Sequence, residues 1–290
     1  MRAIFLTDNG SLRPQATFNL RRVAEKLSKM CGEPVQAASL LHANKIPAEQ
    51  LGGEPAITLG PAATRAAEQG ASEIVVVPFF FGPSRALTDY LPQRMGELQA
   101  RFPHVAVKVA KPLVDERGAV DLRLAQLLAD NVRERMASGE PPKVVLVDHG
   151  SPIPEVTAVR NRLAGQLSVL LANETACVCA ASMERREGEA YRFNEPLLQH
   201  LLADASFHRG EVVLAMLFLS PGRHAGEGGD IASICAAATQ AHPALRVVPT
   251  RLVGEHDGIT AILASRLEAV DSGEVLLMLP ALGAKSGEKQ

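Results

Sequence analysis

Two stretches of this sequence, about 140 residues apart, follow the same pattern. Residues 2–11 read RAIFLTDNGS and residues 143–151 read KVVLVDHGS, so each apolar run ends at Asp-x-Gly-Ser. A second pair matches at nearly the same offset, EIVVVPFFFGPSRA at 73–86 and EVVLAMLFLSPGRH at 211–224. The chain has 290 residues, about twice the length of a common domain. The repeat therefore predicts two copies of one domain and not a solenoid, because each copy is long enough to enclose its own core.

Each copy alternates apolar strands with amphipathic helices. The strand segments are apolar throughout instead of alternating with polar residues, which is typical of strands buried on both faces. The pattern predicts two duplicated doubly wound α/β domains, each with a parallel sheet of about four strands flanked by helices. Strands are expected near 2–7, 34–41, 73–80, 104–109, 143–148, 175–182, 211–219 and 245–249, and helices near 13–29, 61–69, 87–98, 120–132, 155–171, 194–206, 229–241 and 257–270.

A short segment containing Pro and Gly separates the two copies. Residues 137–142 read ASGEPP, a composition that ends helices and stiffens connections. This linker divides a first domain at 1–136 from a second domain at 143–290. The apolar residues 275–282 have no counterpart in the first copy, and they are expected to form an edge strand or a packing segment. Residues 285–290 are expected to form a disordered tail.

The composition argues against several classes of partner. The formal net charge is −2, and the chain has no Trp and only two Tyr, which disfavours nucleic-acid binding. No run approaches the ~20 apolar residues that span a bilayer, and no targeting segment is visible. We therefore expect a cytoplasmic protein with neither a membrane nor a nucleic-acid partner. The four cysteines are too few for a disulfide framework. Cys177 and Cys179 are expected to share one buried face of a strand, with a metal-binding C-x-C as the alternative.

Three residues that can bind metal follow strands of the second copy. His149 comes directly after the first strand, Glu184 follows the second, and His224 lies a few residues past the third. In open parallel sheets, ligands bind beyond the carboxyl ends of the strands, where the strand order reverses. In a flavodoxin-like order the first strand lies between the second and the third, so these side chains would converge. Two imidazoles and a carboxylate suit a divalent metal such as iron, cobalt, nickel or zinc, and they can also accept protons near neutral pH.

The equivalent positions of the first copy carry poor metal ligands. They are Asn9, about Leu41, and Ala86, and His42 leaves the register beside Leu41 open by one residue. Each metal-competent residue taken singly is more often an ordinary loop residue, and it is their coincidence at equivalent strand ends that predicts a site. The other histidines are expected at the surface or at helix ends, although His256 lies in a connection that could close over the site.

Three motifs of the second copy form a recognisable set. They are the DHGS turn at 148–151, the glutamate after the second strand, and the FL-x-PG-R-H segment that leads to Asp230-Ile231. Together they resemble the class II chelatases, specifically the CbiX-type sirohydrochlorin chelatases in their tandem two-domain form. The resemblance implies a lyase of cobalamin or siroheme biosynthesis that inserts cobalt or iron into sirohydrochlorin or a related early tetrapyrrole. It also implies that His149 and His224 hold the metal while Glu184 assists, with catalysis carried by the same three residues. The divalent metal is then a substrate, and no permanently bound cofactor is expected.

The sequence departs from the family pattern in three places. The metal-competent residues lie in the second copy, whereas two-domain relatives often carry them in the first. The loop after His224 is longer by about two glycines than the usual H-x-x-x-D-I. Met216 stands where the first copy has Pro78.

A tetrapyrrole of this kind carries many carboxylates, so cationic and N–H-rich surroundings are expected. Backbone amides at Gly150 and Ser151, just before a helix, can bind anions. Arg223 and Arg185 are the main candidates for paired hydrogen bonds to carboxylates. Further candidates are Arg160, Arg162, Arg186 and Arg192, of which the first two are more simply read as helix-surface charges. The protein is expected to be a monomer or a homodimer.

Two other functions remain open from the sequence. A duplicated domain with one degenerate half is also compatible with a metal or tetrapyrrole carrier that does not catalyse. A hydrolase could use His149 as a base with Ser151 nearby, but Ser151 is not in a G-x-S-x-G turn and no acidic partner is evident.

Overall fold

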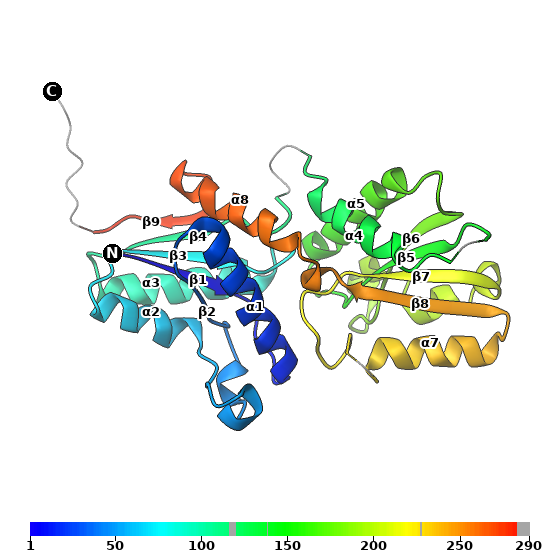
Figure 1. Ribbon diagram of the computed structural model, residues 1–290, viewed down its shortest axis with the longest axis horizontal. Coiled ribbons are helices and arrows are strands. Elements are labelled where there is room, and N and C mark those ends of the chain that lie inside the picture. The colour runs from blue at the N-terminus through cyan, green and yellow to red at the C-terminus, as the bar shows by residue number, and fades with distance from the viewer. Residues whose placement is uncertain (116–119, 138, 227, 283–290) are drawn as a thin grey trace. The chain divides into compact units, whose positions relative to one another are not determined.

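The computed structural model divides into two compact units (Figure 1). Unit 1 contains Met1–Asp115 together with Thr260–Gln290, and unit 2 contains Glu116–Ile259. The tail expected at 285–290 lies outside the described residues. The described residues are 1–115, 120–137, 139–226 and 228–282.

Unit 1 is built on a five-stranded sheet with the order β2-β1-β3-β4-β9. Its first four strands are parallel, and β9 runs antiparallel to β4. The segment at 275–282 therefore supplies an edge strand, which was one of the two predicted alternatives. The strands are β1 (Arg2–Thr7), β2 (Val35–Ala37), β3 (Glu73–Pro78), β4 (Ala106–Ala110) and β9 (Val275–Leu279), and the helices are α1 (Pro14–Cys31), α2 (Leu59–Glu68), α3 (Leu91–Arg101) and α8 (Ile259–Asp271).

Unit 2 is built on a four-stranded parallel sheet with the order β6-β5-β7-β8. In both sheets the first strand of the repeat lies between the second and the third, so the predicted flavodoxin-like order is confirmed. The strands are β5 (Lys143–Asp148), β6 (Cys177–Ser182), β7 (Gly210–Met216) and β8 (Leu245–Leu252), and the helices are α4 (Arg123–Arg133), α5 (Pro154–Leu170), α6 (Leu198–Leu202) and α7 (Asp230–Ala241).

Burial of the central strands explains why their sequences are apolar throughout. Residues 74–77 of β3 and 144–147 of β5 have no exposed surface. Helices cover the sheets with one apolar stripe each, as on α1, where the buried Leu20, Val23 and Leu27 recur at spacings of three and four. The predicted fold class is confirmed.

The compact units do not coincide with the sequence repeats, because the last helix of each repeat packs in the other unit. α4 comes from the first repeat but contacts α5, β7 and β8 of unit 2 (Figure 1). α8 comes from the second repeat but belongs almost wholly to unit 1, where Arg266 donates hydrogen bonds to the carbonyls of Pro112 and Leu113. The compact units therefore differ from the proposed domains at 1–136 and 143–290, and the described residues of the proposed linker, 137 and 139–142, lie inside unit 2. An apolar stripe predicts that a helix is covered, not which sheet covers it.

Two expected elements are shorter than the sequence suggests. The strand near 34–41 is reduced to Val35–Ala37. The helix near 194–206 is reduced to Leu198–Leu202, with 3₁₀ turns at Glu189–Asn194 and Ala205–Phe207. Pro196 has no N–H for a helix, and the Asp204 side chain accepts the Ser206 N–H in place of helix continuation.

The expectation that Cys177 and Cys179 share a buried face is wrong. Cys177 is exposed and Cys179 is only half-buried, because β6 is an edge strand of its sheet. Partial burial, together with the neighbouring Cys177, raises the pKa of the Cys179 thiol to about 11. That thiol is therefore protonated near neutral pH.

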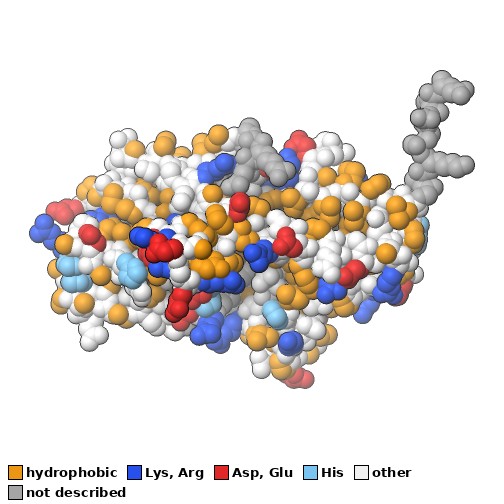
Figure 2. All heavy atoms as spheres, turned by 180° about the vertical axis from the view of Figure 1, so that it is seen from behind, with side chains coloured by type: hydrophobic (Ala, Val, Ile, Leu, Met, Phe, Trp, Pro, Cys, Tyr) orange, Lys and Arg blue, Asp and Glu red, His pale blue; other side chains and the backbone are white. Residues whose placement is uncertain are grey.

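Charges of both signs are spread over the surface. On the face in Figure 2, Lys and Arg groups lie interspersed with Asp and Glu groups. Several are paired, as Lys29 is with Glu25 and Arg246 with Glu211. Exposed pairs contribute only ~0–1 kcal/mol each, so the stability of the fold comes from its cores. None of the described helices combines the length and apolarity needed to cross a bilayer.

Candidate metal and proton-transfer site

The end of β5 is held against the end of β6 by a glycine turn. Gly150 has a φ of +94°, and a Cβ at this position would lie 1.9 Å from the carbonyl oxygen of Glu184. The Glu184 N–H donates to the His149 carbonyl at 3.2 Å, and the Met183 N–H donates to the Asp148 carbonyl at 2.8 Å. This close approach places the Glu184 carboxylate 3.3 Å from Nε2 of His149.

His224 reaches the same place from the loop after β7. The His149 and His224 rings have centroids 4.6 Å apart and are tilted by 59°. Both side chains are accessible, with 44% of His149 and 31% of His224 exposed. Nδ1 of His224 lies 2.5 Å from a carboxylate oxygen of Asp230. The structure therefore brings His149, His224 and Glu184 together at the carboxyl ends of the strands.

These side chains do not form a closed metal centre. In the described part of the chain, no group of three or more His, Cys, Asp or Glu side chains is arranged to hold a metal ion. Glu184 instead contacts Nε2 of His149, the nitrogen that a metal would use. The arrangement is an open pair of imidazoles with a carboxylate beside one of them. Such a pair can bind an ion transiently and pass a proton from imidazole to carboxylate.

A buried polar network lies directly beneath His149. The Asp148 carboxylate accepts a hydrogen bond from Ser182 Oγ at 2.6 Å, and Arg160 donates to the same hydroxyl at 2.5 Å. Arg160 also donates to the Asn194 carbonyl at 3.0 Å. Burial raises the pKa of Asp148, while Ser182, Arg160 and His149 oppose that rise. The Arg160 side chain is 2% exposed, so its reading as a helix-surface charge is wrong.

Asn194 ties the following loop to the His149 turn. Its side-chain oxygen accepts the Ser151 N–H at 2.9 Å, and its amide donates to the Ser151 carbonyl at 2.9 Å. The Gly150 N–H is engaged too, by the Asp148 carboxylate. Both amides expected to bind anions are thus used inside the protein, and substrate could reach them only by displacing these partners. Asn194 carries no sequence signal beyond its polarity in a loop.

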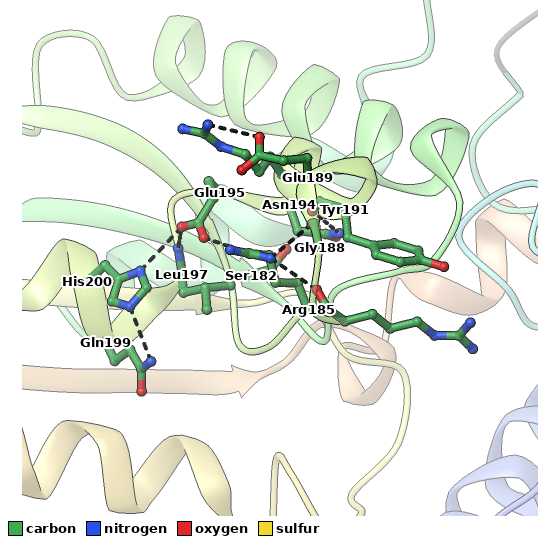
Figure 3. Close-up of polar contacts among 12 residues, drawn as sticks. Ser182, Arg185, Gly188, Glu189, Tyr191, Asn194, Glu195, Leu197, Gln199 and His200 are labelled. Atoms are coloured by element: carbon green, nitrogen blue, oxygen red, sulfur yellow. Dashed lines mark hydrogen bonds and ion pairs between the residues drawn. The ribbon is translucent and has the colours of Figure 1, made fainter.

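The arginines expected to bind substrate carboxylates differ in whether other protein groups already occupy their guanidinium donors. Arg185 donates to Glu195 at 2.7 Å and to the Gly188 carbonyl at 3.3 Å, so it holds its own loop together (Figure 3). Arg192 pairs with Glu189, and Arg186 lies over the Tyr191 ring at 5.8 Å. Arg162 is exposed on α5. Arg223 is exposed beside His224, and among the described residues its guanidinium makes no hydrogen bond or ion pair.

His256 has a local role in its own turn. Its Nδ1 accepts the N–H of Gly258 at 3.0 Å. Burial, followed by the nearby Arg251, lowers the pKa of the His256 imidazole. The ring therefore stays neutral more readily than an ordinary histidine.

Unit 1 repeats the backbone of this site without its ligands. Gly10 has a φ of +87°, and a Cβ there would lie 1.7 Å from the carbonyl oxygen of Leu41. The Leu41 N–H donates to the Asn9 carbonyl at 3.1 Å. Leu41, and not His42, is therefore the counterpart of Glu184, which resolves the register. Asn9 takes the place of His149, and Ala86 takes that of His224 in the sequence.

The Met216 departure has a simple explanation. Its backbone N–H donates to Thr250 Oγ1 at 3.1 Å. A proline, as at Pro78 of the first copy, could not make this bond.

Comparisons with known proteins match both repeats. A family model described as CbiX matches residues 3–134 and 143–270. SirB from Bacillus subtilis with Fe³⁺ superposes with a TM-score of 0.71 at 19% identity, covering 94% of this chain and 98% of that one. SirB from Bacillus subtilis subspecies spizizenii in complex with cobalt gives 0.69 at 18% identity, covering 94% and 96%. No curated protein matches the chain.

A third similar structure is that of CbiX, named as the terminal enzyme for biosynthesis of siroheme in denitrifying bacteria. It gives a TM-score of 0.59 at 15% identity, covering 92% of this chain and 98% of that one. At these identities the structural similarity shows the fold alone.

Proposed function

The chain belongs to the CbiX family, and on that premise we propose that unit 2 inserts a divalent metal, cobalt or iron, into sirohydrochlorin or a related early tetrapyrrole. One observation carries the proposal. Two accessible imidazoles, His149 and His224, face each other at 4.6 Å where the strand order reverses, and Glu184 contacts the first of them. The metals named in the two SirB structures, iron and cobalt, are ions that imidazoles bind.

Metal insertion exchanges one M²⁺ for two pyrrole N–H protons and involves no change of oxidation state. The imidazoles hold the ion from one face, and the macrocycle nitrogens then replace its remaining ligands. His149 then leaves the ion, and its Nε2, which lies 3.3 Å from the Glu184 carboxylate, is suited to accept the two pyrrole protons one after the other and to pass each to that carboxylate. Glu184 is 59% exposed and can release both protons to water in turn.

The substrate's carboxylates are assigned to the cationic groups around the imidazoles. Arg223 is proposed as the principal contact, since it adjoins His224 and makes no hydrogen bond or ion pair with the other described residues. Arg185 has the weaker claim, because binding a substrate carboxylate there requires it to share or leave Glu195.

The test is multiple turnover by the purified chain. Sirohydrochlorin is mixed with Co²⁺ or Fe²⁺ and a catalytic amount of protein, and insertion is followed by the absorbance of the metallated product. The expected result is product in molar excess over protein, formed faster than in its absence. Binding of one metal or tetrapyrrole per chain without acceleration would instead indicate a carrier.

A further inference from the structure

The loop after β7 folds back on His224. The Gly229 N–H donates to the Gly226 carbonyl at 3.0 Å, and the Ile231 N–H donates to the His224 carbonyl at 3.2 Å. A Cβ at position 229 would lie 2.6 Å from the Arg223 carbonyl oxygen and 2.8 Å from that of His224. Only glycine allows so close a return of the backbone. The glycines that lengthen this loop therefore serve to bring the start of α7 back to the histidine.

The residue returned to His224 is Asp230, the first residue of α7. One of its carboxylate oxygens lies 2.5 Å from Nδ1 of His224. An acidic side chain in the first turn of a helix is stabilised by the unpaired amides there. A carboxylate can only accept a hydrogen bond, so in the neutral ring Nδ1 must carry the proton.

We propose that Asp230 is a positioning residue that fixes the tautomer and orientation of His224, so that Nε2 is the atom presented to the metal. The metal-binding part of this inference rests on the proposed function, whereas the tautomer does not. Metal-binding histidines commonly donate their second N–H to such a partner, which orients the ring and increases its basicity. Nothing in the H-x-x-x-D-I pattern by itself distinguishes this role from a helix cap.

His149 is held in a different way. Its Nδ1 lies 3.2 Å from the Gly150 carbonyl oxygen, so a backbone group is placed to accept that N–H. At Nδ1, therefore, His149 meets a backbone acceptor and His224 meets a side chain that can be replaced, while Nε2 of His149 also lies 3.3 Å from the Glu184 carboxylate. In unit 1, Asp89 instead accepts a hydrogen bond from Thr88, close to Ala86. Asp89 thus offers a carboxylate that is close to the position equivalent to His224 but contacts no histidine among the described residues.

The experiment compares Asp230→Ala and Asp230→Asn with Asp89→Asn in the full, metal-free chain labelled with ¹⁵N-histidine. At a pH where histidine is neutral, ¹⁵N–¹H correlation spectra report the tautomer of each ring, and His224→Ala assigns the signal. We expect Nδ1–H to dominate in the unmodified chain and Nε2–H to gain in Asp230→Ala. Asp230→Asn should lie between them, because its amide oxygen is a weaker acceptor of the same shape. Asp89→Asn should leave the tautomer unchanged.

The second readout is binding of Co²⁺ alone, measured by calorimetry. Asp230→Ala should weaken it roughly 10- to 100-fold, with partial rescue in Asp230→Asn and no effect of Asp89→Asn. A His224 tautomer that is the same in Asp230→Ala as in the unmodified chain overturns the inference. If Asp230→Ala does not fold, the same comparison is made with Asp230→Asn, where an unchanged tautomer and unchanged Co²⁺ affinity overturn it. Loss of the tautomer preference in a chain that never turns over sirohydrochlorin would refute the proposed function and leave this inference standing.

Discussion

The turn after β1 and the turn after β5 have the same backbone and different side chains. In both, an Asp-x-Gly sequence places a left-handed glycine against the carbonyl of the following strand's end, Leu41 in one unit and Glu184 in the other. The Asn9 turn carries no imidazole or carboxylate at the positions of His149 and Glu184, yet it keeps the same geometry. The glycine and the aspartate are thus required by the fold of both units. The two histidines and the glutamate are present only in unit 2, and the turn forms in unit 1 without them.

A second difference between the units is in a buried residue of the helix that follows each turn. Arg160 of α5 stands where α1 has Leu20, and both are buried. Arg160 fills the hydrogen-bonding positions around Ser182 and the Asn194 carbonyl. In unit 1, Oγ1 of Thr7 and one oxygen of Asp8 have no partner among the described residues. The buried arginine therefore accompanies the metal-competent copy and secures the loop that follows Glu184.

The largest expected difference between the two turns is in the rate of metal insertion after substitution. His149→Ala or His224→Ala should lower the rate of cobalt insertion at least about 100-fold, since each removes a metal ligand or proton acceptor. Asn9→Ala, at the equivalent position of unit 1, should leave the rate unchanged. Product absorbance in the turnover assay measures both. Full activity of both histidine variants would refute the assignment of the site to unit 2.

The next effect concerns stability. Arg160→Leu gives unit 2 the residue of unit 1, but it leaves Ser182 Oγ and the Asn194 carbonyl without their buried donor and Asp148 without the positive charge 3.8 Å away. Unfolding in urea should show a loss of about 3 kcal/mol. Arg162→Leu, on the exposed side of the same helix, should change the value by no more than about 0.5 kcal/mol. Equal effects of the two would mean that the buried network is not a specific requirement of this copy.

Substitution of the two turn glycines should affect stability in both units but the insertion rate in unit 2 alone. Gly10→Ala and Gly150→Ala each force a Cβ into a carbonyl at positive φ, and each should cost about 1–3 kcal/mol of stability. At a temperature where both variants remain folded, only Gly150→Ala should lower the insertion rate, because it displaces Glu184 from His149. A similar loss of rate in Gly10→Ala would show that unit 1 is not catalytically silent.

The smallest effect is a difference in titration. Burial raises the pKa of Asp8 and of Asp148 above 3.8, but only Asp148 has Arg160 and His149 to oppose the rise. Carboxyl ¹³C shifts should therefore show Asp8 titrating at the higher pH. A raised pKa means that the stability contribution is present below 3.8 and is lost as the pH rises through the folded-state value. Asp8→Asn should accordingly gain stability relative to the unmodified chain as the pH rises above 3.8, and a constant difference would contradict this.

The sequence was sufficient for the repeat, the strand order and the meeting of His149, Glu184 and His224, because each depends on local patterns and on the known behaviour of parallel sheets. It could not show that α4 packs in unit 2 and α8 in unit 1, since an apolar stripe predicts burial of a helix but does not identify the sheet that buries it. It also failed at Arg160 and Cys177, where burial depends on which strand lies at the edge and on which polar atoms need a donor. The contact between Asp230 and His224 could not be predicted either, because it depends on how the glycine-rich loop folds back, and residue spacing does not determine that conformation.

Because α8 and β9 belong to unit 1, the two units are completed in a fixed order during synthesis on the ribosome. All of unit 2, up to Ile259, emerges before residues 260–282 of unit 1. The unit that is begun first is therefore completed last, and until β9 arrives the outer edge of β4 has no strand to cover it. An uncovered edge strand can pair with other chains, so between the synthesis of β4 and that of β9 the nascent protein has an edge open to such pairing.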